Sequence, residues 1–440
     1  MLKYIIRRLF YGALVLFGVI TIVFFLFNFK QGDPSMMLGG NNQNEEILNA
    51  IRHDLGLDLP LYQRYFLYLN DLSPVSIHNK KIEDSRLYLD STKYSYSELF
   101  DWSENRSLVF KYPYLRRSYS TGREVSDIVE STLPDTAVLA VASIVIATIL
   151  GIIMGIFAAL NKGTFLDNSS TVFAVLGMSA PSYLTGIIIA WVGGSVWHEV
   201  TSLPVLPFFF LLLGLTFGII LQKRKKKKAG IIKRIHWGYI FEMTVKGFVF
   251  GMTAWLVGII INGFVGFDAI PGVSVFAELP GTGLEGAGPF RETDDFTGVV
   301  ETHWDRLLLP AITLGIRPLA IVMQLTRSSM LDVLSQDYVR TAKAKGLGQF
   351  KVIFKHTLKN ALNPVVTAVS GWFASLLAGA VFVERVFDWN GIGNQLVDSV
   401  LTEDLPVAMG ITLVIAVFFV VINIVVDILY GFLDPRVRIN

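Results

Sequence analysis

Long apolar runs separated by polar stretches follow one another along the whole chain. Many of these runs are close to the roughly 20 residues that an α-helix needs to cross the hydrocarbon core of a bilayer. The runs that predict membrane spans are 9–29, 136–160, 172–192, 206–221, 245–264, 307–325, 365–382 and 408–430. The pattern therefore predicts an all-α polytopic membrane protein with about eight transmembrane helices.

Composition and charge agree with this prediction and add an orientation. The chain is 52% hydrophobic with a mean hydropathy of +0.52, which is too apolar for an ordinary soluble protein. Residues 1–8 carry Lys3, Arg7 and Arg8, and the run QKRKKKK at 222–228 closes a predicted span. Because lysine and arginine gather on the cytoplasmic side of membranes, both termini are expected in the cytoplasm and the lysine run is interpreted as a positive-inside anchor, with no nucleic-acid partner.

The polar stretches divide the chain into regions. Residues 31–131 contain no run long enough to span and are expected to form an extracytoplasmic region after the first helix. The expected division is 1–30 for an N-terminal transmembrane helix, 31–131 for the extracytoplasmic region, 132–431 for a transmembrane domain that includes an outer loop at 265–305 and a cytoplasmic loop at 326–364, and 432–440 for a cytoplasmic tail.

The segment 337–364, DYVRTAKAKGLGQFKVIFKHTLKNALNP, is a basic and moderately apolar unit between two strongly apolar runs. Helix-start residues precede a run of good helix formers, and Gly346-Leu347-Gly348 interrupts it, so the pattern predicts a helix, a glycine turn and a second helix. Apolar residues recur at a spacing of three and four in the second half and predict one apolar face: Phe350, Ile353, Phe354, Leu358 and Ala361. Such a unit offers this face to a partner.

This segment resembles the "EAA loop" of ATP-binding-cassette importer permeases. The small-residue cluster is Arg340-Thr341-Ala342, the glycine is Gly346, and the downstream leucine is Leu358. The arginine-threonine pair, His356 and Lys359 depart from the general pattern and are similar to the peptide-importer branch. The resemblance implies that the loop docks on a cytoplasmic ATPase, with Gly346 forming the turn. The implied docking residues are Asp337, Arg340, Ala342, Lys345, Gly346, Phe350, Phe354 and Leu358.

Other stretches are similar to the same family and occur in family order. They are GDP at 32–34, IRHDLGLDLPLYQRYFLYL at 51–69, RRSYSTGREV at 116–125, and VERVF, GIG and VDILYGFLDPRVR in the last quarter of the chain. The resemblance implies a type I importer transmembrane domain with a six-span core. Compared with that pattern, the helix pair at 203–264 and the stretch at 70–113 are interpreted as insertions.

The family resemblance also implies a function and a set of partners. The chain would supply half of a translocation pathway for di- or oligopeptides across the cytoplasmic membrane of a bacterium, together with a homologous sister permease, two cytoplasmic ATPases and an extracytoplasmic peptide-binding protein. Nickel, glutathione or another small solute is the alternative substrate within this class. No GxxxxGK[ST] loop occurs, so the chain is not expected to be the ATPase, and no catalytic residue is assigned.

Arg317 is a candidate that owes nothing to the resemblance. It stands near the middle of the apolar run 307–325, beside Pro318, where a central arginine costs roughly 2.5–3.5 kcal/mol on insertion scales. Such a charge must face a partner or a wet cavity, so Arg317 and Pro318 are assigned to the translocation pathway as a hypothesis. A structural contact of Arg317 with another helix or with the sister permease is the alternative. Pro318 is expected to break the helical ladder at this point.

Other chemistries find little support in the sequence. The chain has no cysteine, its histidines show no ligand spacing, and we therefore expect neither a metal site nor a cofactor. GTGLEG at 281–286 matches a dinucleotide fingerprint, but no strand precedes it and no helix follows. An ion-coupled secondary transporter would require acidic relays and an internal repeat, and only Asn423 and Asp427 suggest a relay. A membrane scaffold or an intramembrane hydrolase would not need the basic loop.

Overall fold

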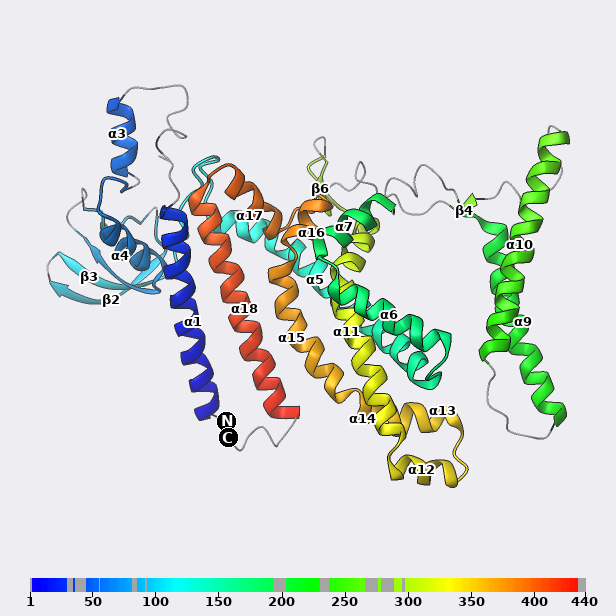
Figure 1. Cartoon of the computed structure of the whole chain (residues 1–440). Coiled ribbons are helices and arrows are strands. Elements are labelled where there is room, and N and C mark those ends of the chain that lie inside the picture. Colours follow the sequence, from blue (N-terminus) through cyan, green and yellow to red (C-terminus); the bar gives the residue numbers. More distant parts are fainter. Residues whose placement is uncertain are drawn as a thin grey trace. The chain divides into compact units, whose positions relative to one another are not determined.

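The computed structural model is mostly helical and divides into two compact units, residues Met1–Ile188 with Ala287–Asn440 and residues Ile189–Gly286 (Figure 1). It describes residues 2–29, 35, 45–54, 56–80, 85–91, 93–103, 105–192, 203–229, 237–265, 276–277, 289–294 and 297–433. Three features named above, at 32–34, 281–286 and 434–440, lie outside the described residues.

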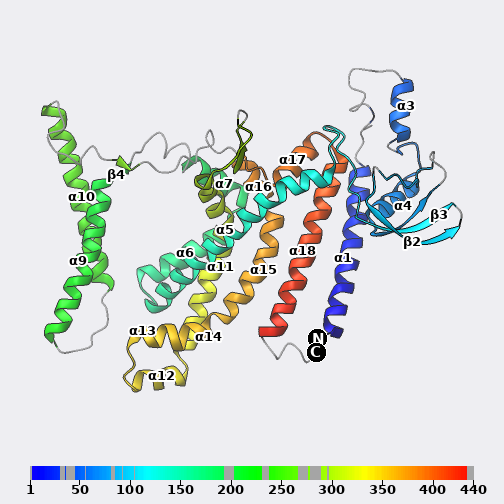
Figure 2. The same cartoon turned by 180° about the vertical axis from the view of Figure 1, so that it is seen from behind.

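Long apolar helices form the body of the first unit. They are α1 (Leu2–Phe29), α5 (Val125–Leu160), α11 (Leu308–Leu334), α15 (Asn363–Gly379) and α18 (Leu405–Leu433). In both views α1 lies beside α18, and α18 beside α15 (Figures 1 and 2). The closest pair is α5 with α11, because a Cβ atom added at Gly155 would lie 2.5 Å from the Cβ of Thr326. Small residues thus let two helix backbones approach, as is usual in membranes.

Five helices of the described residues are long and apolar enough to cross a membrane. They are Ile5–Phe29, Val125–Leu160, Ile240–Asn262, Leu308–Leu334 and Leu405–Val426. A bent pair, α6 (Phe165–Ser179) with α7 (Ser182–Ala190), would make a sixth span, while α15 has 17 residues and Phe209–Ile219 is shorter. A polytopic helical membrane protein is therefore confirmed, and the count of eight spans remains a prediction.

The predicted third span is not one straight helix. Its two halves meet at an angle of 110° at Ala180-Pro181. Ala180 has extended backbone angles (φ −72°, ψ 133°), as expected for a residue that precedes proline, and Pro181 has no N–H to continue the ladder. By contrast, α11 runs from Leu308 to Leu334 through Pro318, so the ladder break expected there does not end the helix.

A small mixed region connects α1 to α5. It contains α3 (Glu45–Asp54), α4 (Leu61–Leu72) and the strands β1 (Val75–Asn79), β2 (Tyr96–Ser103) and β3 (Arg106–Lys111). The three strands form an antiparallel sheet in the order β1-β3-β2, within the stretch interpreted as an insertion. The apolar runs of the sequence did not predict this sheet.

A buried carboxylate organises the connection from α15 to α18. Glu384 in α16 (Val381–Val386) accepts hydrogen bonds from the Thr136 hydroxyl at 2.7 Å and from the Gly393 amide at 2.7 Å. Gly393 belongs to the first turn of α17 (Ile392–Leu401), whose free amides favour a negative charge. A Cβ at Gly391 would lie 2.4 Å from the Glu384 carboxyl carbon, so only glycine fits there. Nearby, β6 (Arg291–Thr293) pairs with β7 (Val300–Thr302), followed by η2 (Trp304–Leu307).

The second unit is a helical hairpin of α9 (Val205–Ala229) and α10 (Trp237–Val265), with a short β4 (Leu203–Pro204) and β5 (Phe276–Ala277) pair. Glycines again allow close packing, because a Cβ at Gly247 would lie 2.3 Å from the carbonyl oxygen of Phe210. Helix α9 extends beyond the apolar run 206–221 because the lysine, arginine and glutamine residues that follow are also good helix formers, and α10 begins eight residues before the run 245–264.

Candidate functional site

The glycine turn of the basic segment has a specific hydrogen-bonded geometry. Helix α12 (Asp337–Ala344) ends where the Leu347 amide donates to the Ala342 carbonyl at 3.3 Å and the Gly346 amide donates to the Lys343 carbonyl at 3.0 Å. These two bonds make a Schellman motif, which requires a left-handed residue after the helix. Gly346 is that residue, with φ +76°. The helix, glycine turn and helix expected from the sequence are therefore present.

The second half of the segment is wound more loosely than an α-helix. It comprises α13 (Gln349–Lys351), a π-helical turn (Val352–Leu358) and α14 (Lys359–Ala361). The buried Thr357 hydroxyl donates to the Val352 carbonyl, five residues earlier, at 3.0 Å. We call residues 337–361 the basic loop from here on. Its wider winding shifts side chains around the axis, and π-turns are frequent at functional sites.

This winding divides the predicted apolar face into two. Ile353 and Ala361 are buried against Ala159 of α5 and Met330 of α11, with Leu358 half-buried beside them. These contacts attach the loop to the ends of two long helices. Ala342 packs inside the loop against Val339 and Val352, so its side chain is buried by the loop itself.

Phe350 and Phe354 lie on the open side of the loop. They are 72% and 47% exposed, and their ring centroids are 4.3 Å apart. The same segment carries five exposed basic residues: Arg340, Lys343, Lys345, Lys351 and Lys355. Asp337 and Arg340 form an exposed pair at 3.4 Å. The loop thus presents an exposed pair of tilted aromatic rings and several exposed basic side chains, while its other face is buried against α5 and α11.

Arg317 lines a small pocket of about 70 Å³ between α6, α7, α11 and α15. Hydroxyl groups of Ser182, Thr185 and Ser375 and the ring of Trp372 line the same pocket. The Arg317 Nε atom lies 3.5 Å from the carbonyl oxygen of Met178, in the last turn of α6 before the Pro181 break. The side chain is exposed and lines the pocket, and this long contact involves only one of the five N–H donors of the guanidinium. Pro318 is buried in α11, beside but outside the lining.

Comparison with known proteins shows what kind of protein carries this loop. The profile of the family described as "Binding-protein-dependent transport system inner membrane component" matches residues 151–439, and the profile of the corresponding N-terminal region matches residues 1–83. The chain belongs to this family. The resemblance seen in the sequence is thereby confirmed, and this permease is a multi-pass transport component of an inner membrane.

Named relatives align with the permease over its whole length. The di/tripeptide transport system permease protein of Pseudomonas aeruginosa is 30% identical over 441 residues, covering 100% of this chain and 99% of that protein. The dipeptide transport system permease protein of Escherichia coli strain K12 is 28% identical over 443 residues, with 100% and 99% coverage. The glutathione transport system permease protein of Escherichia coli O6:H1 is 27% identical over 438 residues, with the same coverage.

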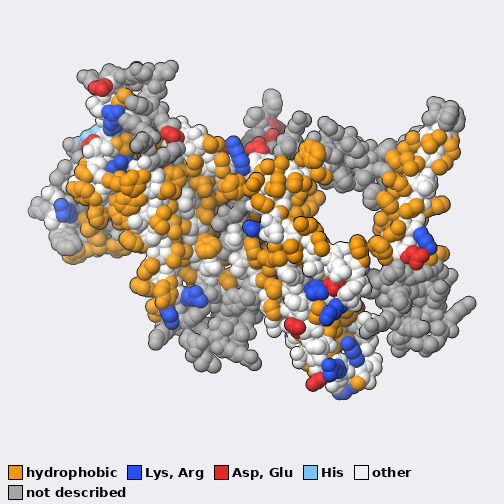
Figure 3. Space-filling model, viewed as in Figure 1, with side chains coloured by type: hydrophobic (Ala, Val, Ile, Leu, Met, Phe, Trp, Pro, Cys, Tyr) orange, Lys and Arg blue, Asp and Glu red, His pale blue; other side chains and the backbone are white. Residues whose placement is uncertain are grey.

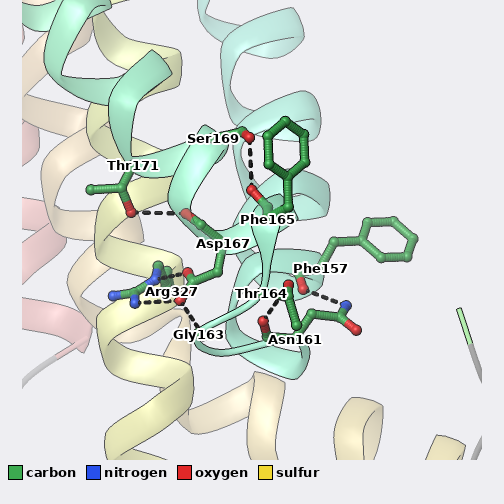
Figure 4. A network of polar contacts seen from close by, with 9 residues as sticks. All are labelled: Phe157, Asn161, Gly163, Thr164, Phe165, Asp167, Ser169, Thr171 and Arg327. Carbon is green, nitrogen blue, oxygen red and sulfur yellow. Dashed lines mark hydrogen bonds and ion pairs between the residues drawn. The ribbon is translucent and has the colours of Figure 1, made fainter. Parts of the chain in front are cut away.

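The structure adds a pair of residues that sequence reasoning did not single out. Asp167 at the start of α6 accepts two hydrogen bonds from Arg327 of α11, one from Nε and one from Nη2 at 2.9 Å, and a third from the Gly163 amide at 2.9 Å (Figure 4). Asp167 is buried and Arg327 half-buried. The pair fixes the turn after α5 to α11, seven residues before that helix ends at Leu334 and shortly before the basic loop begins.

No local sequence pattern predicts this ion pair, because its two residues are 160 positions apart. The available signal was an acid and an arginine placed near the same end of two predicted spans, where charges usually find partners. Within the part of the chain that the structure describes, no group of three or more histidine, aspartate or glutamate residues could hold a metal ion.

Proposed function

We propose that this permease forms half of the pathway by which di- or oligopeptides cross the cytoplasmic membrane, and that its basic loop lies in the cytoplasm and couples it to cytoplasmic ATPases. The observation that carries the coupling is the exposed Phe350–Phe354 pair on a loop whose other face is buried against α5 and α11. A rigidly attached aromatic pair is suited to fill a cleft on a partner and to transmit its movement to the helices behind.

The remaining parts of the proposal follow from this orientation. Both termini lie in the cytoplasm, and the region 31–131 lies on the extracytoplasmic side of the membrane, where part of it meets a peptide-binding protein. Two ATPase subunits hydrolyse ATP, and a homologous sister permease contributes the other wall of the pathway. The relatives named for di/tripeptide and dipeptide transport support peptides as the substrate, and the relative named for glutathione supports that tripeptide as the alternative.

Copurification tests the docking role. Burying one phenylalanine side chain contributes about 1.5–3 kcal/mol, so Phe350→Ala and Phe354→Ala should each weaken ATPase binding by roughly ten- to a hundredfold. Phe165→Ala is the matched control, because Phe165 is also exposed but stands at the start of α6. Equal recovery of ATPase with all three variants would reject the loop as the docking element.

Arg317 is proposed to attract a peptide carboxylate or peptide carbonyls in the pocket. Arg317→Gln keeps a hydrogen-bond donor near the Met178 carbonyl but removes the charge, so it should slow uptake of peptides with a free C-terminal carboxylate more than uptake of C-terminally amidated peptides. A purely structural contact would reduce both equally. If the variant leaves rate and preference unchanged, Arg317 has no role in the pathway.

A further inference from the structure

The three-stranded sheet between α1 and α5 buries most of its polar side chains on one face and exposes apolar side chains on the other. On the covered face, four polar residues are at most 2% exposed and flank one apolar residue, the fully buried Val109: Ser76, His78, Ser107 and Lys111. On the open face, Val75, Ile77, Phe100 and Phe110 are between 41% and 66% exposed. The register places Val75 opposite Phe110, and Ile77 and Phe100 on either side of Leu108, so these side chains form one continuous patch. Antiparallel sheets in soluble proteins usually turn the apolar face inward.

Hydrogen bonds hold the polar face in place. The Lys111 ammonium donates to the Asp71 carbonyl at 2.5 Å, and the Tyr94 hydroxyl donates to the Asp71 carboxylate at 2.9 Å. Ser76 and His78 are within hydrogen-bond distance of each other at 3.0 Å. A slip of one residue would turn the Lys111 side chain to the other face and away from the Asp71 carbonyl, so this bond favours the register that leaves the apolar face open.

The helix that precedes the sheet lies at membrane depth. The Tyr65 hydroxyl of α4 is 2.7 Å from the Thr21 hydroxyl of α1. Thr21 stands eight residues before Phe29, the end of α1, which corresponds to about 12 Å along the helix. Tyr68 and Leu72 of α4 form one buried cluster with Phe24 of α1 and with α18 residues up to Leu413, eight residues into that helix. Two spans thus place α4 at the same depth.

The other sides of α4 and the sheet continue the apolar surface of the spans. Tyr62 and Phe66 are exposed and one turn apart on α4. In both ribbon views β2 and β3 lie beside the Phe29 half of α1 (Figures 1 and 2). The space-filling view shows hydrophobic side chains along this region and onto α1 (Figure 3).

We propose that the open face of the sheet, together with Tyr62 and Phe66, rests in the lipid leaflet at the Phe29 end of α1. Lipid is the occupant that this depth requires, since a protein bound there would have to displace the bilayer around α1. Tyrosine near the edge of such a surface suits the membrane interface. The contact with lipid would also fix the depth of the neighbouring segment 118–120 relative to the membrane. In this segment the Ser118 and Ser120 hydroxyls donate to Asp404, the residue before α18, at 2.6 and 2.8 Å.

Spin labels can measure this depth directly. The chain has no cysteine, so Phe66→Cys, Ile77→Cys and Phe110→Cys each give one labelling site on the full-length protein in lipid nanodiscs. Ile22→Cys, exposed on α1, is the lipid control, and Arg123→Cys, exposed in the 116–125 segment, is the water control. All replaced side chains are exposed, so folding should tolerate the changes. Accessibility to oxygen and to a water-soluble nickel complex is then compared.

Contact with lipid predicts an oxygen-to-nickel accessibility ratio that matches Ile22→Cys at the three test sites and is several-fold above Arg123→Cys. High accessibility to nickel at Ile77→Cys and Phe110→Cys would overturn the proposal in favour of a water-exposed sheet. Low accessibility to both reagents would overturn it in favour of a protein partner.

Discussion

The turn at Gly346 allows the coupling proposal to be tested by strain alone. Gly346 has φ +76°, and a Cβ atom added there meets nothing within 4 Å, so the only penalty for a larger residue is its backbone conformation. A left-handed conformation costs an L-residue about 1–2 kcal/mol. Gly346→Ser should therefore favour other turn geometries and weaken ATPase binding by about five- to thirtyfold.

Gly348 provides the control two residues further on. Its φ is −60° and its ψ 145°, its surroundings are equally open, and serine is a good residue at a helix N-cap. Gly348→Ser should bind the ATPase like the unaltered chain. The assay is the affinity of the solubilised permease for the copurifying ATPase, with membrane abundance measured in parallel. Equal affinity of the two serine variants, at equal abundance, would refute the argument from the Schellman turn.

Three further outcomes follow from buried or crowded groups. Asp167→Asn removes the charge that pairs with Arg327 and one of its two acceptor oxygens, so a buried ion pair is lost and thermal unfolding should show a loss of about 1–3 kcal/mol; unchanged stability would mean that the pair contributes nothing. Gly391→Ala should lower the amount of folded protein, because overpacking costs about 1–3 kcal/mol, whereas Gly371→Ala, where the added Cβ meets nothing, should not. Burial lowers the pKa of the Lys111 ammonium from 10.5 to about 8, so the unfolded chain binds more protons between these values and stability should rise with pH across that window. Lys111→Met should flatten that rise, and an identical pH profile would contradict the assignment.

The long helices could be predicted because a helix that crosses lipid requires a long run of apolar residues, which is visible in the sequence. Each apolar run corresponds to a helix, including α1, α5, α11 and α18. The exception is informative: the run 172–192 is uniformly apolar, so hydropathy cannot register the 110° bend at Pro181. Only the local rule for a residue before proline carried that information.

The basic loop was predictable in outline, but which of its side chains are buried and which are exposed was not. The glycine and the helix formers define the turn and the two helices. A period of 3.6 placed Ile353 with Phe354, but the π-turn buries the first and exposes the second. The three-stranded sheet also escaped prediction, because its apolar positions look like a core until its depth beside α1 is known.

Contacts distant in the chain could not be predicted from one sequence. Asp167 with Arg327, and Glu384 with Thr136, depend on the packing of α5 against α6, α11 and α16. Taken one at a time, Asp167, Arg327 and Glu384 could each have been exposed residues of a loop, so the sequence did not predict their partners. The family motif around Glu384 marked the segment without showing that its carboxylate caps the next helix.

Depletion of peptides from the medium tests directly whether this chain takes part in peptide import. Cells that carry this chain, lack it, or carry it with Gly346→Ser are given a mixture of di- to oligopeptides, and the peptides left in the medium are measured over time. Our account predicts that peptides disappear only with the chain and more slowly with the variant. Equal depletion in all three cultures, with the protein present in the membrane, would contradict a role in peptide import.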